Sequence, residues 1–196
     1  MKFLNVLAAL SLVLFIGCGG GSSEQQTESA QPQEQETETA SDVRTIDIVG
    51  IDQMKFVVAE DAEGISVGDQ VGNNNMLLLE TITAQPGEEI RIRLKTESTL
   101  PASAMAHNWL LLAMGVDAQE FANAAVQAKD NDYVPADRQD QILAQTGLAA
   151  GGETVEVTFT APEETGDYDY ICSFPGHFAA GMKGVLNVEG SSGSDM

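Results

Sequence analysis

The chain has 196 residues, of which 30 are acidic and 9 are basic, so its formal net charge is −21 at pH 7. This length predicts one globular domain with additional segments. The shortage of lysine and arginine excludes nucleic acid as a partner, because phosphate binding depends on those side chains. The negative charge favours solubility outside the cell and, to a lesser degree, steering toward a basic surface on a partner.

The first 17 residues have the pattern of a secretory signal peptide, in which Lys2 precedes an apolar run that is short for a membrane span. Gly17 followed by Cys18 is similar to a bacterial lipoprotein cleavage site, and this predicts lipid attachment to Cys18. The alternative is an N-terminus that stays uncleaved as an anchor. In both cases we expect an exported domain held at the periplasmic, extracytoplasmic face of the cell membrane.

A polar segment separates Cys18 from the rest of the chain. Residues 19–42 are rich in Gly, Ser, Gln, Thr and Glu and contain no aromatic or basic residue. Such a segment cannot bury enough apolar surface to offset the entropy of ordering, so residues 18–43 are predicted to be a disordered acidic linker. Residues 191–196 form a second polar tail. The globular domain is therefore expected over residues 44–190.

Alternating apolar residues predict β-strands throughout this domain. In the segment 88–95, Ile90, Ile92 and Leu94 alternate with basic side chains, as in a strand with one buried face. Further strands are expected in the segments 46–51, 54–58, 76–83, 108–113, 153–160, 168–172 and 186–188. Short strands separated by Gly and Pro indicate an all-β sandwich rather than a parallel sheet.

Residues 117–145, approximately, interrupt the strand pattern. A helix is expected from position 117 or 118 through position 128, with Phe121 and Ala125 on its buried face. Pro135 fits the first turn of a second short helix that runs through position 144. We expect these two helices to form a flap that covers one side of the sandwich.

One short segment near the C-terminus contains three potential metal donors, Cys172, His177 and Met182. A Pro-Gly pair directly before His177 allows the sharp turn that would bring them together. The only other histidine of the chain is His107. A thiolate, two imidazoles and a weak thioether are the donors of a blue-copper electron-transfer site. The sequence therefore predicts one copper ion bound by these four side chains.

Each donor has an ordinary role when it is considered alone. Cys172 and Met182 could be core residues, and His177 could be a surface histidine. Zinc also binds cysteine and histidine, but its structural sites take a fourth strong ligand and methionine is a poor one. A Cys-His nucleophile pair oriented by Asn108 is a third interpretation. The Pro-Gly turn beside the histidine favours a ligand loop over a catalytic strand end.

The segment CSFPGHFAAGMKG and the upstream AHNW resemble the azurin and auracyanin branch of the cupredoxin family. The 4 residues between His177 and Met182 are more similar to auracyanins than to azurins. The resemblance covers roughly residues 44–190 and implies a Greek-key β-sandwich with a short helical insertion at about 117–145. It also implies a type 1 copper ion held by His107, Cys172, His177 and Met182. Ala106 stands where azurins usually have glycine, so a contact from its carbonyl to the metal does not carry over.

The resemblance further implies roles for residues beside the donors. Asn108 would brace the two ligand segments against each other, and the backbone amides of Asn108 and Phe174 would donate to the Cys172 sulfur. One ring edge of His177 would reach the surface through an apolar electron-exit patch. The other members of this patch would be Met105, Phe174, Pro175 and Phe178.

The implied function is a type 1 blue-copper electron carrier rather than an enzyme. It would be a monomer that shuttles single electrons between membrane redox complexes or cytochromes of a photosynthetic or respiratory chain, through brief contacts. A copper enzyme would need a further copper built on several more histidines, which the sequence does not contain. A copper storage or delivery protein would hold its metal at an exposed site rich in Met or Cys, and an adhesion sandwich would not require this donor set.

Overall fold

The computed structural model describes residues 43–72 and 74–190. The predicted signal peptide, Cys18, nearly all of the predicted linker and the tail 191–196 lie outside these residues. Within the described ranges, no helix is both long enough and apolar enough to cross a membrane.

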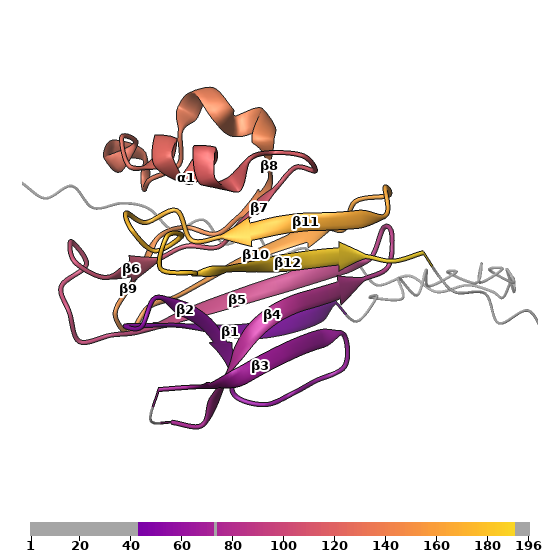
Figure 1. Ribbon diagram of the computed structural model, residues 1–196, viewed down its shortest axis with the longest axis horizontal. Coiled ribbons are helices and arrows are strands. Elements are labelled where there is room, and N and C mark those ends of the chain that lie inside the picture. Colours follow the sequence, from indigo (N-terminus) through magenta and orange to yellow (C-terminus); the bar gives the residue numbers. More distant parts are fainter. Residues whose placement is uncertain (1–42, 73, 191–196) are drawn as a thin grey trace, which may run out of the picture. The chain divides into compact units, whose positions relative to one another are not determined.

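Strands are the predominant regular elements of the described residues (Figure 1). They are β1 (Arg44–Ile51), β2 (Lys55–Val58), β3 (Ile65–Val71), β4 (Met76–Ala84), β5 (Glu89–Glu97), β6 (Ala106–His107), β7 (Leu110–Leu112), β8 (Ile142–Gln145), β9 (Ala149–Ala150), β10 (Thr154–Thr160), β11 (Gly166–Ile171) and β12 (Lys183–Val188). The main sheet has the order β10-β5-β1-β2-β4-β12-β11-β7-β8, with β3 paired to β4, and β6 pairs with β9 in a separate sheet. The pairs β1–β5 and β4–β12 are parallel, which requires crossover connections within an otherwise antiparallel arrangement.

β5 shows why these residues form strands. Ile90, Ile92 and Leu94 are fully buried, whereas Arg93 and Lys95 on the opposite face are exposed. This alternation places one face of the strand on the core and the other in water. Because β5 pairs with β1 on one side and with β10 on the other, the three strands form one continuous apolar wall.

The predicted donors are part of the hydrophobic core. Cys172 and Met182 belong to the same cluster of buried residues as Trp109 and Tyr170. The rings of Trp109 and Tyr170 stack with their centroids 5.6 Å apart. A close-packed interior deforms little, so donors that are embedded in it are held in place by the fold.

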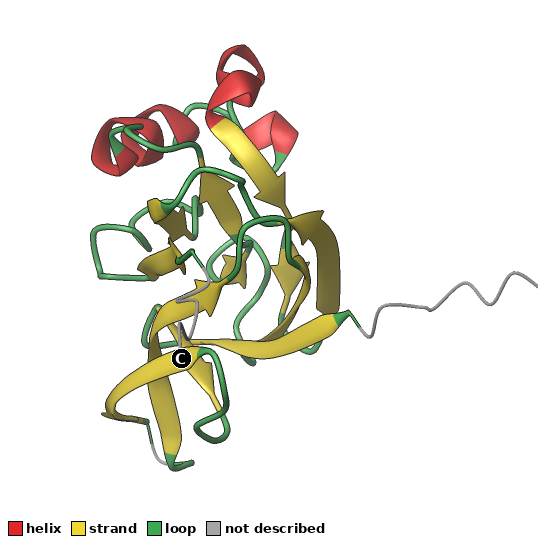
Figure 2. Cartoon of the chain, turned by 90° about the vertical axis from the view of Figure 1, so that its right-hand side faces the viewer, coloured by secondary structure: helices red, strands yellow, loops and turns green. Residues whose placement is uncertain are grey.

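The predicted all-β sandwich with a helical flap is confirmed. The helices gather at one end of the described region, next to the strands (Figure 2). α1 (Ala118–Ala125) begins at Asp117, whose carboxylate accepts a hydrogen bond from the Glu120 amide at 2.9 Å. Phe121 and Ala122 of this helix pack against Leu110 and Leu112, so the flap covers β7. The helix ends at Ala125, three residues earlier than predicted.

The predicted second helix is wrong in its final residues. A 3₁₀ segment, η2 (Ala136–Gln141), follows Pro135, and the chain then becomes strand β8. β8 pairs with β7 through Leu112↔Ile142 and Leu111↔Ala144. Alternating burial over Leu143 to Gln145 is the period of a strand, and pairing with β7 overrides the helical pattern of the local sequence.

The predicted strand at 108–113 is shorter in the structure, where only Leu110–Leu112 forms a strand. β6 ends at His107 and pairs with β9, whereas β7 begins at Leu110 and belongs to the main sheet. Asn108 and Trp109 lie between them, and the Trp109 amide donates to the Thr146 hydroxyl at 3.0 Å instead of continuing a ladder. β3 was not predicted, because its sequence includes a glycine and its pairing with β4 shifts register twice.

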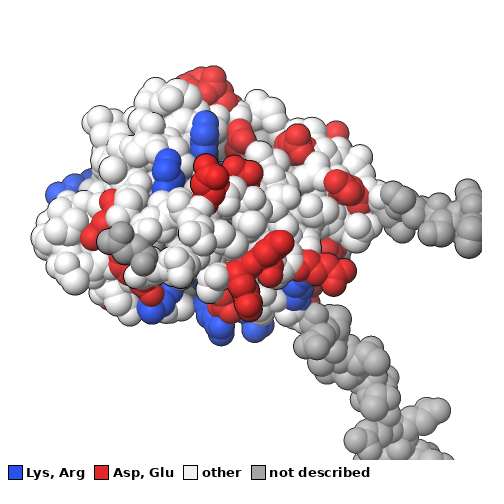
Figure 3. Space-filling model, turned by 60° about the horizontal axis from the view of Figure 1, so that its bottom comes forward, with Lys and Arg blue, Asp and Glu red and all other residues white. Residues whose placement is uncertain are grey.

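Acidic side chains are spread over the face shown in Figure 3, with fewer basic side chains between them and along its lower edge. Among the described residues, four basic side chains are paired with carboxylates: Arg44 with Glu88, Arg93 with Asp47, Lys95 with Glu97 and Arg138 with Glu120. The surface therefore keeps the acidic character that the composition predicts.

Candidate metal centre

The structure brings three of the four predicted donors directly together. The ligand atoms of His107, Cys172 and His177 lie within 4.8 Å of one another, and all three residues are buried. His107 ends β6, whereas Cys172 and His177 follow β11 on one loop. Met182 is fully buried at the end of that loop. Two separate parts of the chain thus converge on one point in the core.

The spacing of the donor atoms fits a single metal ion. The two Nδ1 atoms of His107 and His177 face each other at 3.2 Å, and Cys172 Sγ lies 3.4 Å from the Nδ1 of His177 and 4.0 Å from that of His107. Two nitrogens about 2.0–2.1 Å from one ion, at tetrahedral to trigonal angles, would lie roughly 3.3–3.6 Å apart, and sulfur at about 2.3 Å would lie roughly 3.5–3.8 Å from each of them. The observed distances are close to these values.

Backbone hydrogen bonds close the ligand loop. The Cys172 amide donates to the Met182 carbonyl at 3.0 Å, so the first and last residues of the loop are joined. Inside the loop, the Met182 amide donates to the His177 carbonyl at 2.9 Å. Gly176 has φ +85° and Gly181 has φ +90°, a region that glycine reaches without strain. These two positions allow the sharp turns that direct the donors inward.

Burial keeps the two imidazoles unprotonated. It lowers the pKa of His107 from the ordinary 6.5 to about 3, with the neighbouring His177 as a smaller cause. Burial likewise lowers the pKa of His177 to about 4. Unprotonated nitrogens are the form that binds a metal, so both rings are ready to act as ligands at neutral pH.

For Cys172, in contrast to the two histidines, burial favours the protonated form, which does not bind a metal. Burial raises the pKa of this thiol from 9.0 to about 12, although backbone hydrogen bonds from Asn108 and Phe174 act in the other direction. These are the two amides that the family resemblance implies as donors to the sulfur. A metal ion needs the thiolate, so metal binding must displace the thiol proton.

Asn108 joins the two ligand segments. Its side-chain oxygen accepts a hydrogen bond from the Ser173 amide at 2.9 Å, and its amide nitrogen donates to the Ser173 hydroxyl at 2.8 Å. The same nitrogen donates to the Asp132 carbonyl at 3.2 Å, which adds the flap to the network. Asn108 thereby links the residue next to His107 with the residue next to Cys172. Ser173 and Asp132 did not stand out in the sequence.

The ring of His107 is positioned by packing. Its buried Nε2 has no hydrogen-bond partner among the described residues. A Cβ atom added at Gly50 in β1 would lie 2.6 Å from the His107 Cδ2 and 2.8 Å from its Cγ. Gly50 therefore leaves the space that the ring occupies. A glycine inside a strand pattern signals such a close approach, so the sequence carried this information.

We predict that Gly50→Ala displaces the His107 ring. Overpacking of this kind costs about 1–3 kcal/mol, so the metal-free protein should unfold at lower denaturant concentration, and the visible spectrum of the copper form should shift. Gly147→Ala is the control, because its added Cβ would have Val155 as its nearest neighbour, at an ordinary 3.8 Å. Equal effects of the two substitutions on the spectrum would contradict this role for Gly50.

The residues of the predicted electron-exit patch differ in their exposure. Met105 and Phe174 are buried, whereas Pro175 and Phe178 are half-buried. The Phe174 ring centroid lies 4.7 Å from that of His177. Only 2% of His177 is exposed, and Phe174 and His107 are its aromatic neighbours. Ala106 is buried and pairs with Ala150 in β6–β9.

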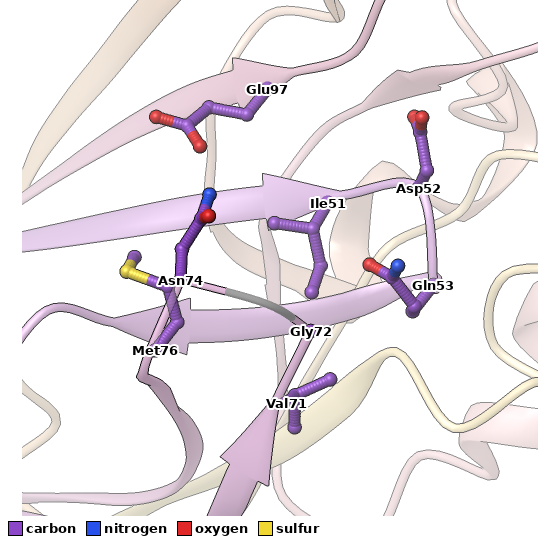
Figure 4. Close-up of a pocket in the computed structure, with 8 residues that line it drawn as sticks. All are labelled: Ile51, Asp52, Gln53, Val71, Gly72, Asn74, Met76 and Glu97. Atoms are coloured by element: carbon purple, nitrogen blue, oxygen red, sulfur yellow. The ribbon is translucent and has the colours of Figure 1, made fainter.

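A separate surface pocket lies beside the turn between β1 and β2 (Figure 4). None of the four predicted donors lines it. Its lining contains neither the thiolate nor the imidazoles of a copper site, and its one sulfur is the thioether of Met76. The metal centre is thus a buried site and not an open pocket. The lining residues are Ile51, Asp52, Gln53, Val71, Gly72, Asn74, Met76 and Glu97.

The chain is similar in sequence to known copper proteins. A family model described as "Copper binding proteins, plastocyanin/azurin family" matches residues 66–189. Auracyanin-A of Chloroflexus aurantiacus is 43% identical over 109 residues, which are 55% of this chain and 63% of that protein. Azurin-1 of Alcaligenes xylosoxydans xylosoxydans is 38% identical over 125 residues, 61% of this chain and 95% of that protein.

Solved structures give the same result. A structure of auracyanin A, called a "blue" copper protein of Chloroflexus aurantiacus, has a TM-score of 0.55 and 34% identity, and the match covers 74% of this chain and 98% of that one. Reduced auracyanin of Roseiflexus castenholzii has a TM-score of 0.56 and 29% identity, over 74% of this chain and 96% of that one. Because the family match spans more than half of the chain and includes all four candidate donors, the chain belongs to the copper-binding plastocyanin/azurin family, a family of electron-transfer proteins, and its donor set fits one type 1 copper ion.

Proposed function

We propose that the protein carries single electrons by means of one type 1 copper ion held by His107, Cys172, His177 and Met182. The observation that supports this most strongly is the convergence of two facing imidazole nitrogens and one buried thiol at distances of 3.2–4.0 Å. When bound, copper supplies a one-electron couple between Cu(II) and Cu(I), and a Cys-His-His set with a weak axial methionine suits both oxidation states.

The chain's own residues keep the donors fixed while the charge changes. Cys172 and Met182 are joined through the backbone, and Asn108 ties the Cys172 segment to the His107 segment. Because the donors are buried, water has little access to them. A site that neither rearranges nor gains water needs little reorganisation when an electron enters or leaves. This is the property that distinguishes a carrier from a copper enzyme with an open coordination position.

His177 is the donor through which we expect electrons to enter and leave. It lies beside the half-buried Pro175 and Phe178, and the whole loop from Cys172 to Met182 contains no charged side chain. A small apolar surface suits brief encounters, because redox complexes bury little area. We infer that partners are redox proteins, such as cytochromes or membrane complexes of a photosynthetic or respiratory chain, that meet a monomer. The description of auracyanin A as a protein of a photosynthetic bacterium supports this inference.

We further propose that the domain is exported and works at the extracytoplasmic face of the membrane. The apolar N-terminal run and the Gly17-Cys18 pair support a signal peptide over residues 1–17 and lipid attachment at Cys18. A linker over residues 18–43 would then allow the copper domain, residues 44–190, to reach more than one partner. Mass spectrometry of the membrane-extracted protein tests this proposal, because lipidation predicts a chain that begins at Cys18 and carries added acyl mass.

The visible spectrum of the purified protein tests the proposed copper site. After addition of Cu(II), the oxidised protein should absorb intensely in the visible range, and a one-electron reductant should remove the colour reversibly. Zinc binding by the same residues would give a colourless protein, because zinc has a filled d shell and no redox chemistry. A loaded protein without colour would therefore overturn the proposal.

We predict that His177→Gly opens the bound copper to external ligands while Cys172 remains coordinated. Removal of the ring leaves a space beside the half-buried Pro175, through which imidazole or halide can enter. Titration with imidazole should change the visible spectrum of the variant and leave that of the natural protein unchanged. Electron transfer to an external partner should become slower in the variant. If both the spectrum and the transfer rate were unaltered, His177 would be neither a copper ligand nor the residue through which electrons pass.

A further inference from the structure

The turn that joins β1 to β2 contacts both segments that supply the donors. Gly50, near the end of β1, leaves the space for the His107 ring. Lys55, the first residue of β2, pairs with Ile51 across the turn and extends its side chain to the ligand loop. The turn is closed by a hydrogen bond from the Met54 amide to the Ile51 carbonyl at 2.8 Å. One hairpin thus lies against both halves of the metal centre.

The contact between Lys55 and the loop is specific. The Lys55 ammonium donates a hydrogen bond to the carbonyl of Ala180, which lies between His177 and Met182. A Cβ atom added at Gly181 would lie 2.6 Å from Lys55 Nζ. The ammonium therefore sits directly on the peptide unit that joins Ala180 to Gly181, in the space that the glycine leaves free.

This carbonyl has no backbone partner within the described loop. The bonds there run from the Ala180 amide to the Gly176 carbonyl, from the Gly181 amide to the Phe178 carbonyl and from the Met182 amide to the His177 carbonyl. None of them ends on the carbonyl of Ala180. Lys55 satisfies this acceptor, and a hydrogen bond from an ammonium is about twice as strong as one between neutral groups.

We propose that Lys55 is a positioning residue of the copper site, which fixes the segment Ala180–Met182 and thereby the place of Met182 relative to the other donors. This proposal rests on the proposed function, because it takes Met182 as a ligand. Mutation of residues that orient metal ligands through hydrogen bonds typically lowers metal affinity by about 10- to 100-fold. Lys55 acts in this way through the backbone, since it donates to a carbonyl two residues before Met182.

The chain offers a matched control in Lys183. Its ammonium lies 4.8 Å from the centroid of the Phe178 ring, so it also carries a positive charge next to the ligand loop. Lys183→Met removes the same charge as Lys55→Met but leaves the hydrogen bond to Ala180 intact. Lys55→Arg keeps both the charge and a donor. A comparison of the three variants separates the hydrogen bond from the general effect of charge.

The first measurement uses the metal-free full-length protein. Hydrogen exchange of the Gly181 and Met182 amides should become about tenfold faster in Lys55→Met and should stay unchanged in Lys183→Met. This readout needs no copper, so it tests the contact even if the proposed function fails. Lys55→Gln, which keeps a shorter neutral donor, is measured in parallel and should give an intermediate rate. It replaces Lys55→Met in every comparison if that variant does not fold.

The second measurement is the rate of copper transfer to a chelator, followed by the loss of visible absorption. Release should be about tenfold faster in Lys55→Met, close to the natural rate in Lys55→Arg and unchanged in Lys183→Met. The proposal is overturned if Lys55→Met and Lys183→Met release copper equally fast, or if exchange accelerates without faster release. If the natural protein takes up copper without becoming coloured, the proposed function fails, and the exchange result alone then decides whether Lys55 holds the loop.

Discussion

Cys172→Ser is expected to give a copper-loaded protein without intense visible absorption and without the reversible one-electron couple. In the proposed site, Cys172 would supply the thiolate that makes a copper centre of this kind blue and redox-active. A serine hydroxyl in the same buried position stays protonated at neutral pH and is a poor donor to either oxidation state. The absorption spectrum, the electron paramagnetic resonance spectrum and cyclic voltammetry of the loaded variant measure the effect.

The fold of this variant should survive. Cys172 is fully buried and receives hydrogen bonds from two backbone amides, and a serine oxygen can accept them in its place. We expect the metal-free variant to lose at most about 1–3 kcal/mol of stability, the range for a polar group with imperfect partners. Met182→Leu is the matched control, since it removes the other sulfur at similar volume and should leave the colour. Strong absorption that persists in Cys172→Ser would show that the sulfur does not bind the metal.

The metal-free protein is expected to be most stable between about pH 6.5 and pH 9, with losses on both sides. The pKa of His107 falls to about 3 and that of His177 to about 4 in the folded state, so between these values and 6.5 the unfolded chain binds more protons. Stability is therefore lost as pH falls through this window. Each unit of pKa shift corresponds to about 1.4 kcal/mol, so the two rings together should account for several kcal/mol near pH 4.

The alkaline side depends on Cys172 and, above pH 10, also on Tyr170, whose pKa is raised by burial. The pKa of Cys172, about 12, lies above the 9.0 of an exposed thiol, so above pH 9 the unfolded chain releases a proton that the folded chain keeps. Stability should fall as pH rises from 9 toward 12. Denaturant unfolding at a series of pH values measures both limbs. His107→Gln should make the acid limb shallower and Cys172→Ala the alkaline one. A variant whose profile matches that of the natural protein would contradict the assigned cause.

Three of the four candidate donors could be predicted from the sequence because their spacing is a local property. Cys172, His177 and Met182 lie on one loop, with glycines at the turns that the loop requires. The strand β5 could be predicted for the same reason, since its inward residues alternate with charged ones. Where the chemistry of one segment determines its structure, the sequence alone is sufficient.

The parts that could not be predicted depend on contacts between distant segments. Ile142–Gln145 forms a strand because β7 is available for pairing, which nothing in those residues indicates. Lys55 lies 125 positions before Ala180, and its side chain has no local feature that distinguishes it from a solvated lysine. A bracing role for Asn108 was expected only through the family resemblance, whereas its partner Ser173 was identified only from the structure.

The hydrogen bond between the Cys172 amide and the Met182 carbonyl gives the ligand loop a common closing point. A loop that is sealed at its base can change length without altering the strands that carry it. Mutation could therefore insert or delete residues between His177 and Met182 and adjust the redox properties of the protein while the scaffold stays constant. Because its two ends are joined in this way, the loop could also be exchanged as a unit between related proteins.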